Sequence, residues 1–539
     1  MKKNLLGISL ITMSCLYGLL AAIIILIFII TGLPAIGGII ISGIVLLIQF
    51  LISPYLTDLT LKWFYKADFN AEVPEYLKNF INEVCKKYDM KYPKIAIIED
   101  GAPNAFTYGR TKNDARVVVT RGIFNLLNEQ EVIAVVAHEL GHAEHYDMAF
   151  MTVAQLVPLV LYGIYEAFTR PSKNRSNNKN GGYLEMIGLI AYILYLISEY
   201  IVLWLSRTRE YYADSFSIEE TKNPNALETA LIKIGYGLSI NNSEQDTGKK
   251  KKHTISNSKI IGIFDTKTSK SLVATSYNNG QISTENIKNA MKWETWNVWA
   301  ILYELKSTHP LISKRLKAIG ERCAEFNQQP FVTFDLKKPE SYLDDFIIEV
   351  IINYLPIISI IITMIATLII APIEPYNVYA LKILGIGGII TLILSLIKMR
   401  RRYKNNIGYK ETTVSDLLGE VKVSGVTSIP CTLEGTIIGR GNPGCIFNED
   451  FVIKDETGIM FLDYNQPLTV VNKIFALFKS PEYFNKKIKI KGWYRRSPVP
   501  YVEIYTMEID GKTKKCYTYA TALITRIVLI VMSILLCLL

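Results

Sequence analysis

Cysteine is sparse in this chain of 539 residues, which holds seven of them and no C-x-x-C pair. The cysteines are scattered, and Cys15 and Cys537 lie inside apolar stretches. This scatter indicates neither a disulfide framework nor a cysteine metal cluster. It suits domains that face a reducing cytoplasm.

Histidine is scarcer still, with five residues, yet two of them stand close together. His138 and His142 are four residues apart, with Glu139 between them. On a helix this spacing places both imidazoles on one face, near enough to share a metal ion, with the Glu139 carboxylate close by. Two nitrogen ligands and an acid that takes a proton from water are what a zinc hydrolase needs. The alternative interpretation is a solvated helix with two surface histidines.

The residues around this motif favour the metal site. The run from Val132 to Ala137 is apolar and predicts a buried helix, and Asn128 followed by glutamates is a typical helix start. Gly141 leaves space where a substrate or another backbone can approach. His145 follows within one turn but points about 60° away from His142, so we expect it to take no part in catalysis.

Charged residues are also few, at 20%, whereas 50% of the chain is hydrophobic, which is too apolar for an ordinary soluble protein. Long apolar runs explain the excess, because each is about as long as the roughly 20 helical residues that cross a bilayer. Four runs form two predicted hairpins, residues 5–30 with 35–52 and residues 346–371 with 379–397. A cleaved signal peptide is the alternative for the first run, but that run is too long and a second follows at once.

Three further runs are weaker. Residues 150–168 and 184–205 each carry an acid, so each is either a span or a buried helix of a catalytic domain. The C-terminal run becomes long enough to span when the residues from 519 onward are included, which gives a hydrophobic segment at 519–539.

Basic residues beside these runs predict the orientation, because cytoplasmic loops are rich in Lys and Arg. Lys2 and Lys3 precede the first run, and residues 398–404 are basic after the sixth. Hairpins place both flanks and the long hydrophilic segments in the cytoplasm. The loop 170–183 disagrees, since it is basic and the hairpins place it on the opposite side, so either it departs from the rule or its two flanking helices do not fully cross. The flanks explain the net charge of +10, so we expect no nucleic-acid partner.

Local patterns outline the hydrophilic parts. Residues 75–88 predict an amphipathic helix, and 95–98 and 117–119 predict strands, which indicates an α+β unit before the histidine motif. The helix of the motif is expected to run directly into the apolar run at 150–168. The polar stretch 241–258 is either a lipid-headgroup contact or a loop, and we interpret it as a loop.

Residues 408–515 change character. Apolar and charged residues alternate in three stretches, at 421–423, 488–491 and 502–504. Alternation of this kind predicts a β domain of about five or six strands, of OB type. Arg495 and Arg496 can bind anions, but arginines at strand ends are typically solvated, and we expect that here.

A catalytic zinc usually takes three protein ligands and leaves the fourth position to water. The stretch from Ser206 to Asp214, at the exit of the fourth apolar run, offers Glu210 and Asp214 on one helical face. A glutamate beside two arginines is ordinarily a surface ion pair. The apolar hairpin begins right after the histidines, however, and returns Glu210 to their side.

Four sequence pieces occur in a fixed order within residues 5–325: Pro103–Phe106, Val119–Gly122 leading to His138–His142, Ser206–Asp214 and Ser307–Pro310. In these pieces the chain resembles the HtpX-like family of membrane zinc metalloproteases, which is related to the CaaX prenyl proteases. The resemblance implies one zinc ion per chain, with His138, His142 and Glu210 as its ligands. It also implies that Asp214 orients a ligand histidine.

The resemblance assigns two further features. Asn104, Ala105 and Phe106 are expected on an edge strand beside the cleft, where an extended peptide can add by backbone hydrogen bonds. The family has a histidine near its active site at the position of His309, so His309 is expected to stabilise the transition state. A lone histidine before a proline is otherwise more often structural.

The predicted fold is a multi-pass α-helical membrane protein with a mostly α, zincin-type metalloprotease domain and a C-terminal all-β, OB-like domain. The predicted organisation is a transmembrane hairpin at 1–54, the metalloprotease domain at 55–325 with its apolar hairpin at 150–205, a transmembrane hairpin at 346–397, the β domain at 408–515 and the hydrophobic segment at 519–539. Resemblance to the minimal family ends before the last three parts.

The predicted function is that of a membrane-embedded zinc endopeptidase in the cell membrane, with its active site facing the cytoplasm. Its partners are the lipid bilayer and polypeptide substrates, namely membrane-associated or misfolded proteins, as in protein quality control. One alternative is a processing protease for prenylated C-termini. Another is a scaffold that recruits partners through its β domain, although a scaffold has no need of Glu139.

Overall fold

The computed structural model describes residues 2–31, 35–100, 103–169, 181–244, 277–278, 281–282, 284–333, 342–404, 408–440, 449–497 and 499–538. The chain divides into two compact units. The first holds the described residues up to 238 together with 304–333, and the second holds the other described residues. Two predicted loops lie mostly outside the described residues. Of the loop 170–183 the structure describes only 181–183, and of the loop 241–258 only 241–244.

Long apolar helices dominate both units: α1 (Lys2–Thr31), α2 (Ala35–Phe64), α6 (Asp147–Thr169) and α7 (Gly181–Thr221) in the first, and α13 (Leu343–Ile370), α14 (Ala380–Arg402) and α17 (Thr518–Leu538) in the second. In the described residues, six helices are long and apolar enough to cross a membrane, and they include α6, α7 and α17. The chain is therefore a multi-pass membrane protein. The span predicted at 35–52 lies within α2, which continues to Phe64.

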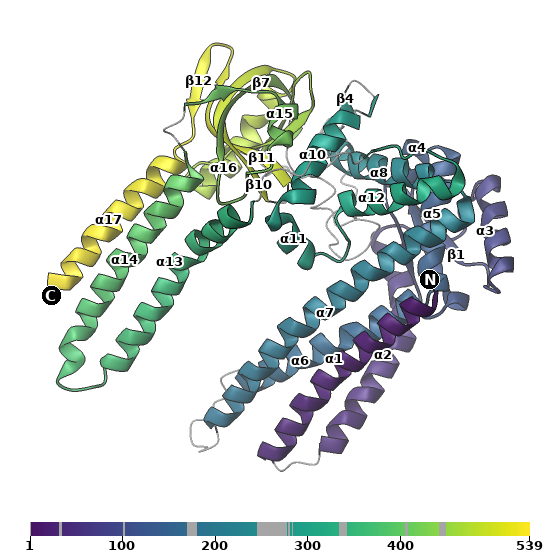
Figure 1. Ribbon diagram of the computed structural model, residues 1–539, viewed down its shortest axis with the longest axis horizontal. Helices are drawn as coiled ribbons and strands as arrows, with labels where there is room; N and C mark the ends of the chain where they lie inside the picture. Colours follow the sequence, from purple (N-terminus) through teal and green to yellow (C-terminus); the bar gives the residue numbers. More distant parts are fainter. Residues whose placement is uncertain are drawn as a thin grey trace. The chain divides into compact units, whose positions relative to one another are not determined.

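In the first unit, α1, α6 and α7 pack along their length (Figure 1). Their shared core combines leucine, isoleucine and valine side chains with alanines that let the helices approach closely, such as Ala154 and Ala191. The N-terminal part of α1 lies at the end of α7 that carries Glu210, since Ser9 accepts a hydrogen bond from Arg209 at 2.6 Å.

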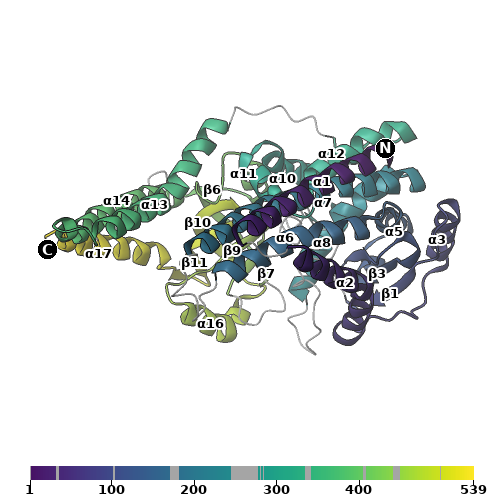
Figure 2. The same cartoon turned by 90° about the horizontal axis from the view of Figure 1, so that it is seen from below.

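The hydrophilic part of the first unit contains a small sheet in the order β1-β3-β2. Strand β1 (Lys94–Ile98) is parallel to β3 (Arg116–Thr120), and β2 (Ala105–Tyr108) is antiparallel to β3 and forms an edge. Helix α5 (Glu129–Glu144) packs on this sheet (Figure 2). The other helices are α3 (Glu75–Lys87), α4 (Arg121–Leu126), α8 (Pro224–Glu244) and α12 (Ile312–Arg322). The helix predicted at 75–88 and the strands predicted at 95–98 and 117–119 are confirmed.

Helix α5 begins as its sequence predicts and ends earlier than predicted. The Asn128 side chain accepts a hydrogen bond from the backbone N–H of Glu131, and the Glu131 carboxylate accepts one from the N–H of Asn128, which makes a capping box. The expectation that this helix runs directly into the apolar run is wrong, because Tyr146 has φ 57° and breaks it. Helix α6 then starts afresh at Asp147.

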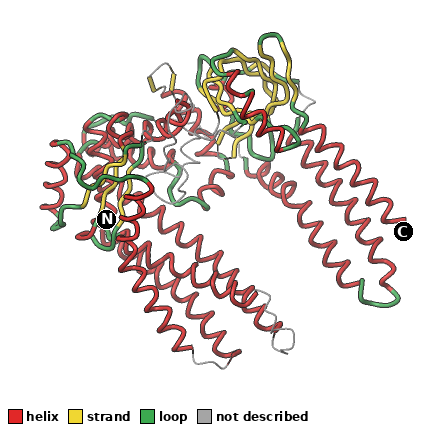
Figure 3. Tube along the Cα trace, turned by 180° about the vertical axis from the view of Figure 1, so that it is seen from behind, coloured by secondary structure: helices red, strands yellow, loops and turns green. Residues whose placement is uncertain are grey.

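In the second unit, α13, α14 and α17 lie side by side (Figure 3). The residues between α14 and α17 form a seven-stranded, barrel-like sheet: β6 (Lys410–Glu411), β7 (Ile429–Arg440), β8 (Phe451–Lys454), β9 (Ile459–Asp463), β10 (Lys487–Ser497), β11 (Val499–Ile509) and β12 (Lys512–Lys515). Five strands close into a ring in the order β7-β8-β9-β11-β10, because β10 also pairs with β7. Shorter elements complete the unit: β4 (Tyr277–Asn278), β5 (Gln281–Ile282), α10 (Thr284–Trp296), α15 (Val414–Gly419) and α16 (Thr469–Phe478). Helix α11 (Val298–Leu305) ends where the chain passes from the second unit to the first.

Two predictions for this part are wrong. Residues 421–423 form no strand, and the carbonyls of Val421 and Val423 accept hydrogen bonds from the Asn297 side chain at 2.8 and 3.0 Å. Arg495 and Arg496 are both fully buried rather than solvated. Arg495 pairs with Glu503, and the guanidinium of Arg496 lies 4.7 Å from the Trp293 ring centre. Ion pairing and cation–π contact compensate the loss of solvent around these charges.

Candidate active site

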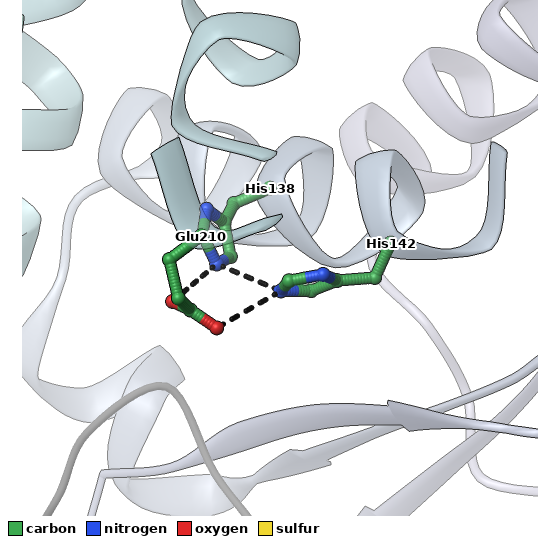
Figure 4. A group of neighbouring side chains, drawn as sticks. All are labelled: His138, His142 and Glu210. Carbon is green, nitrogen blue, oxygen red and sulfur yellow. Dashed lines mark hydrogen bonds and ion pairs between the residues drawn. The ribbon is translucent and has the colours of Figure 1, made fainter. Parts of the chain in front are cut away.

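The three side chains predicted as ligands converge at the junction of two helices (Figure 4). His138 and His142 extend from α5, and Glu210 extends from α7. The Nε2 atoms of the two histidines are 3.2 Å apart. The Glu210 carboxylate reaches both, with Oε2 at 3.6 Å from His138 Nε2 and Oε1 at 3.5 Å from His142 Nε2. His138 is fully buried and Glu210 nearly so.

This geometry fits a metal ion. Ligand atoms about 2.0–2.2 Å from a tetrahedral zinc lie roughly 3.3–3.6 Å from one another, which matches the separations seen here. The donor set also fits, because two imidazole nitrogens and one carboxylate oxygen are common ligands of a catalytic zinc. The three side chains can therefore hold a metal ion and leave further positions to water and substrate.

An aspartate orients each histidine of the cluster. Asp214 Oδ1 lies 2.9 Å from His138 Nδ1, and Asp147 Oδ2 lies 2.7 Å from His142 Nδ1. A carboxylate at Nδ1 keeps the proton on that nitrogen and turns the Nε2 lone pair toward the metal position. Of these two acids, the sequence predicts Asp214 and misses Asp147.

Two buried arginines hold these aspartates. Arg315 of α12 donates to both carboxylate oxygens of Asp214, at 2.6 and 2.9 Å, and its Nη1 lies 3.4 Å from Glu210 Oε2. Arg209 pairs with Asp147 and also donates to the carbonyl of His145 at 2.7 Å. Each ligand histidine is thus backed by a carboxylate and then by a guanidinium.

The carboxylates of the cluster make it strongly attractive to cations. Burial lowers the pKa of His138, but hydrogen bonds to Asp214 and Glu210 outweigh burial and raise that pKa to about 9. The pKa of His142 is also raised, because the Asp147 and Glu210 carboxylates outweigh burial there. A divalent cation is favoured by the same excess of negative charge that raises these two pKa values.

A cavity of about 330 Å³ opens beside the cluster, and Glu139, His142, Glu210 and His309 lie in its wall. Glu139 is 2% exposed. His309 Nε2 lies 3.5 Å from Glu210 Oε1, and its Nδ1 is hydrogen-bonded to the Thr308 hydroxyl at 2.9 Å. The structure therefore places both residues predicted to act in catalysis next to the predicted ligands.

Of the three residues predicted to bind substrate, Phe106 lies in the wall of the same cavity, and Asn104 and Ala105 are not among the residues that line it. Phe106 and Thr107 line it, and the Thr107 hydroxyl donates to the backbone carbonyl of Glu139 at 3.2 Å. Ala105 is fully buried. The backbone of Asn104 pairs with Thr120 of β3, since its N–H donates to the Thr120 hydroxyl at 2.7 Å and its carbonyl accepts the Thr120 N–H at 2.9 Å.

His145 lies apart from the cluster, as predicted. It follows the last residue of α5, and its ring packs edge-on against Tyr212 and Phe216, with centroids 6.3 and 5.8 Å away. It belongs to the packing between α5 and α7.

Sequence reasoning misses Asp147, Arg209 and Arg315. Asp147 follows His142 by five residues, a spacing that does not share a helical face, and the break at Tyr146 is what turns it back. Arg209 stands in the stretch already singled out, beside Glu210, but its partner cannot be read from spacing. Arg315 follows His309 by six residues and carries no signal of its own.

A fully buried and a half-buried histidine one helical turn apart, completed by a carboxylate from a second helix beside candidate membrane spans, define a membrane metalloprotease. Residues 71–323 match the sequence model of Peptidase family M48. The chain is 39% identical over 237 residues to a protease HtpX homolog of Methanothermobacter thermautotrophicus, a match that covers 43% of this chain and 87% of that protein. The chain therefore belongs to the HtpX-like metalloproteases, which hydrolyse peptide bonds.

A second curated relative carries the same name. A protease HtpX homolog of Archaeoglobus fulgidus is 33% identical over 198 residues, which is 37% of this chain and 56% of that protein. Among solved structures, Ste24p of S. mikatae is similar with a TM-score of 0.30 and 20% identity, and the match covers 42% of this chain and 57% of that one. The family match ends at residue 323, before the barrel-like sheet.

We predict that Asp214→Asn and Asp147→Asn each weaken zinc affinity by about 10- to 100-fold, because a neutral amide no longer fixes the tautomer of the ligand histidine. Competition with a fluorescent chelator measures this affinity in the purified protein. Asp89→Asn is the matched control, since Asp89 is exposed with φ 50°, which asparagine also tolerates. Unchanged affinity in both active-site variants would show that the aspartates do not orient the ligands.

Proposed function

We propose that this protein is a zinc-dependent endopeptidase that cleaves membrane-associated or misfolded polypeptides at the cytoplasmic face of the cell membrane. The observation that carries the proposal is the position of the cluster at the end of two candidate spans. Asp147 is the first residue of α6, and Glu210 lies on α7, whose apolar part begins at Glu185. A span of roughly 20 residues from Glu185 ends near Leu205, so Glu210 lies about one turn beyond it.

We further propose that one zinc ion is held by His138, His142 and Glu210. A zinc ion supplies a Lewis acid that lowers the pKa of a water molecule toward about 7. Glu139, in the wall of the same cavity, accepts the proton of the attacking water and passes it to the leaving amine. His309 donates a hydrogen bond to the oxyanion that develops on the substrate carbonyl.

Strand β2 is the proposed docking edge for the substrate backbone. Backbone groups alternate in direction along a strand, and the N–H and carbonyl of Asn104 point toward β3. Those of Thr107 therefore point away from β3, toward the open edge, whereas Ala105 is fully buried. An extended peptide that pairs there passes along the cavity wall beside Glu139.

The cytoplasmic orientation is supported by the basic end of α14, with Arg400, Arg401 and Arg402 in its last turn. The OB type of residues 408–515 is part of the proposal, and two features support it. The five-stranded ring runs β7-β8-β9-β11-β10, and helix α16 is inserted between β9 and β10.

Trapping in cells tests this function. The Glu139→Gln variant, isolated after gentle cross-linking, should retain uncut proteins that the wild type releases as fragments. We expect integral membrane proteins to be enriched, with wild-type cleavage sites in their cytoplasmic segments. Recovery of soluble proteins alone, or cleavage in segments on the other side of the membrane, would contradict the proposed substrate class and orientation.

A further inference from the structure

The cavity beside the metal cluster extends along two membrane helices. On α6, Asp147 and Gln155 both line it, and they are eight residues apart on one face, which is about 12 Å along the helix. On α7, Ser206 and Val202 lie one and two turns before Glu210 and line it as well. The cavity therefore runs from the cluster into the region of the candidate spans.

The far part of this cavity is apolar. Its walls there are Met151, Val202 and Leu203, and Met148, next to Asp147, continues the apolar wall toward the cluster; Met148 is 9% and Val202 6% exposed. The charged residues that line the cavity are all at the cluster end, where Arg209 pairs with Asp147 and Glu210 faces the histidines. A charged side chain entering the far part would lose its water without gaining a partner.

Gln155 is a polar residue of the cavity wall on the same helix as Met151. It lies inside a candidate span, is solvent-accessible and lines the cavity. A carboxamide facing lipid would leave its hydrogen bonds unmade, so polar residues in spans typically face a functional cavity. Gln155 therefore marks the end of the apolar part.

We propose that this apolar part is a subsite for one large apolar side chain of the substrate, carried by a residue next to the bond that is cleaved. The proposal rests on the proposed function and deepens it, because an apolar residue beside the cleaved bond is what a polypeptide presents where it leaves the bilayer. About 330 Å³ is near the lower limit for ligand cavities and fits one side chain and a peptide unit. The two methionines line the subsite with flexible side chains that adapt to different apolar shapes.

Peptide kinetics test the subsite. The full-length protein is purified in detergent with zinc, and a casein segment that it cleaves is made as fluorogenic peptides. Each residue flanking the cleaved bond is replaced in turn by Ala, Phe, Trp or Asp, and kcat/KM is measured. At one of the two positions we expect the Phe peptide to exceed the Asp peptide by about 10-fold or more.

Two variants change the size of the subsite in opposite directions. Met151→Trp fills it, and we expect kcat/KM for the Phe peptide to fall by about 10-fold while the Ala peptide stays within about twofold. Leu203→Ala enlarges it and should raise the ratio of the Trp peptide to the Phe peptide. Leu159→Trp is the matched control, since Leu159 lies on the same helix but is 57% exposed and outside the cavity.

Different results of these experiments would overturn the subsite and the proposed function. Equal cleavage of the Phe and Asp peptides by the wild type overturns the subsite. The subsite is also overturned if Met151→Trp lowers kcat/KM equally for all peptides while Leu203→Ala leaves the ratio of kcat/KM for the Trp peptide to that for the Phe peptide unchanged. Absence of casein cleavage by the zinc-loaded wild type, or cleavage that persists in Glu139→Gln, overturns the proposed function instead.

Discussion

Replacing Glu139 by glutamine will leave zinc bound and lower peptide cleavage by about 100- to 10,000-fold, the usual contribution of a general base. Glutamine keeps the size of the side chain but cannot accept the proton of the attacking water. Glu139 lines the cavity beside His142 and is outside the group of three converging ligands, so the metal has no reason to leave. Cleavage of casein and the zinc content of the same preparation measure the two effects.

Glu129→Gln is the matched control for this variant. Glu129 lies on the same helix, in its first turn, and is exposed. We expect its cleavage rate to equal that of the wild type. Full activity in purified Glu139→Gln would mean that another group takes the proton, and the role of Glu139 would have to be abandoned.

Replacing Glu210 by alanine will remove the metal as well as the activity. The two histidines then offer two of the usual three protein ligands, and zinc content should fall from about one ion per chain to below about 0.1 after dialysis. The change also takes one negative charge from beside Arg315, whose Nη1 lies 3.4 Å from Glu210 Oε2. Asp214 still pairs with Arg315, which should keep the variant folded.

The control for Glu210→Ala lies on the same helix. Glu219 is 45% exposed and contacts Arg322 at the surface, so Glu219→Ala should keep both zinc and activity. Elemental analysis gives the zinc content, and circular dichroism shows whether both variants keep their helices. A Glu210→Ala variant that retains one zinc ion per chain would rule out Glu210 as the third ligand.

The sequence predicts the histidine pair because its geometry is local. His138 and His142 lie on one helix, and the capping box at Asn128 starts that helix where the pattern indicates. Glu210 is distant in sequence, but the apolar hairpin between them constrains where the chain returns, so its approach to the histidines could be predicted too.

Asp147 and Arg315 could not be predicted because their positions depend on backbone breaks and on tertiary packing. A positive φ at Tyr146 ends α5 and turns Asp147 back toward His142, and no spacing rule encodes that turn. Arg315 reaches Asp214 only because α12 packs against α7.

In the second unit, too, local patterns could be predicted from the sequence and contacts between distant elements could not. Alternation correctly predicts strands at 488–491 and 502–504, which lie in β10 and β11. It fails at 421–423, where three alternating residues are too few to distinguish a strand from a loop that binds Asn297. The burial of Arg495 depends on Glu503 and Tyr403, which the fold brings together from different elements.

The central claim is that His138, His142 and Glu210 hold the metal while Glu139 acts on water. Zinc content determined side by side for the wild type, Glu139→Gln and Glu210→Ala tests it most directly. We expect about one zinc ion per chain in the wild type and in the inactive Glu139→Gln variant, and below about 0.1 in Glu210→Ala. Loss of zinc in Glu139→Gln together with its retention in Glu210→Ala would contradict the account.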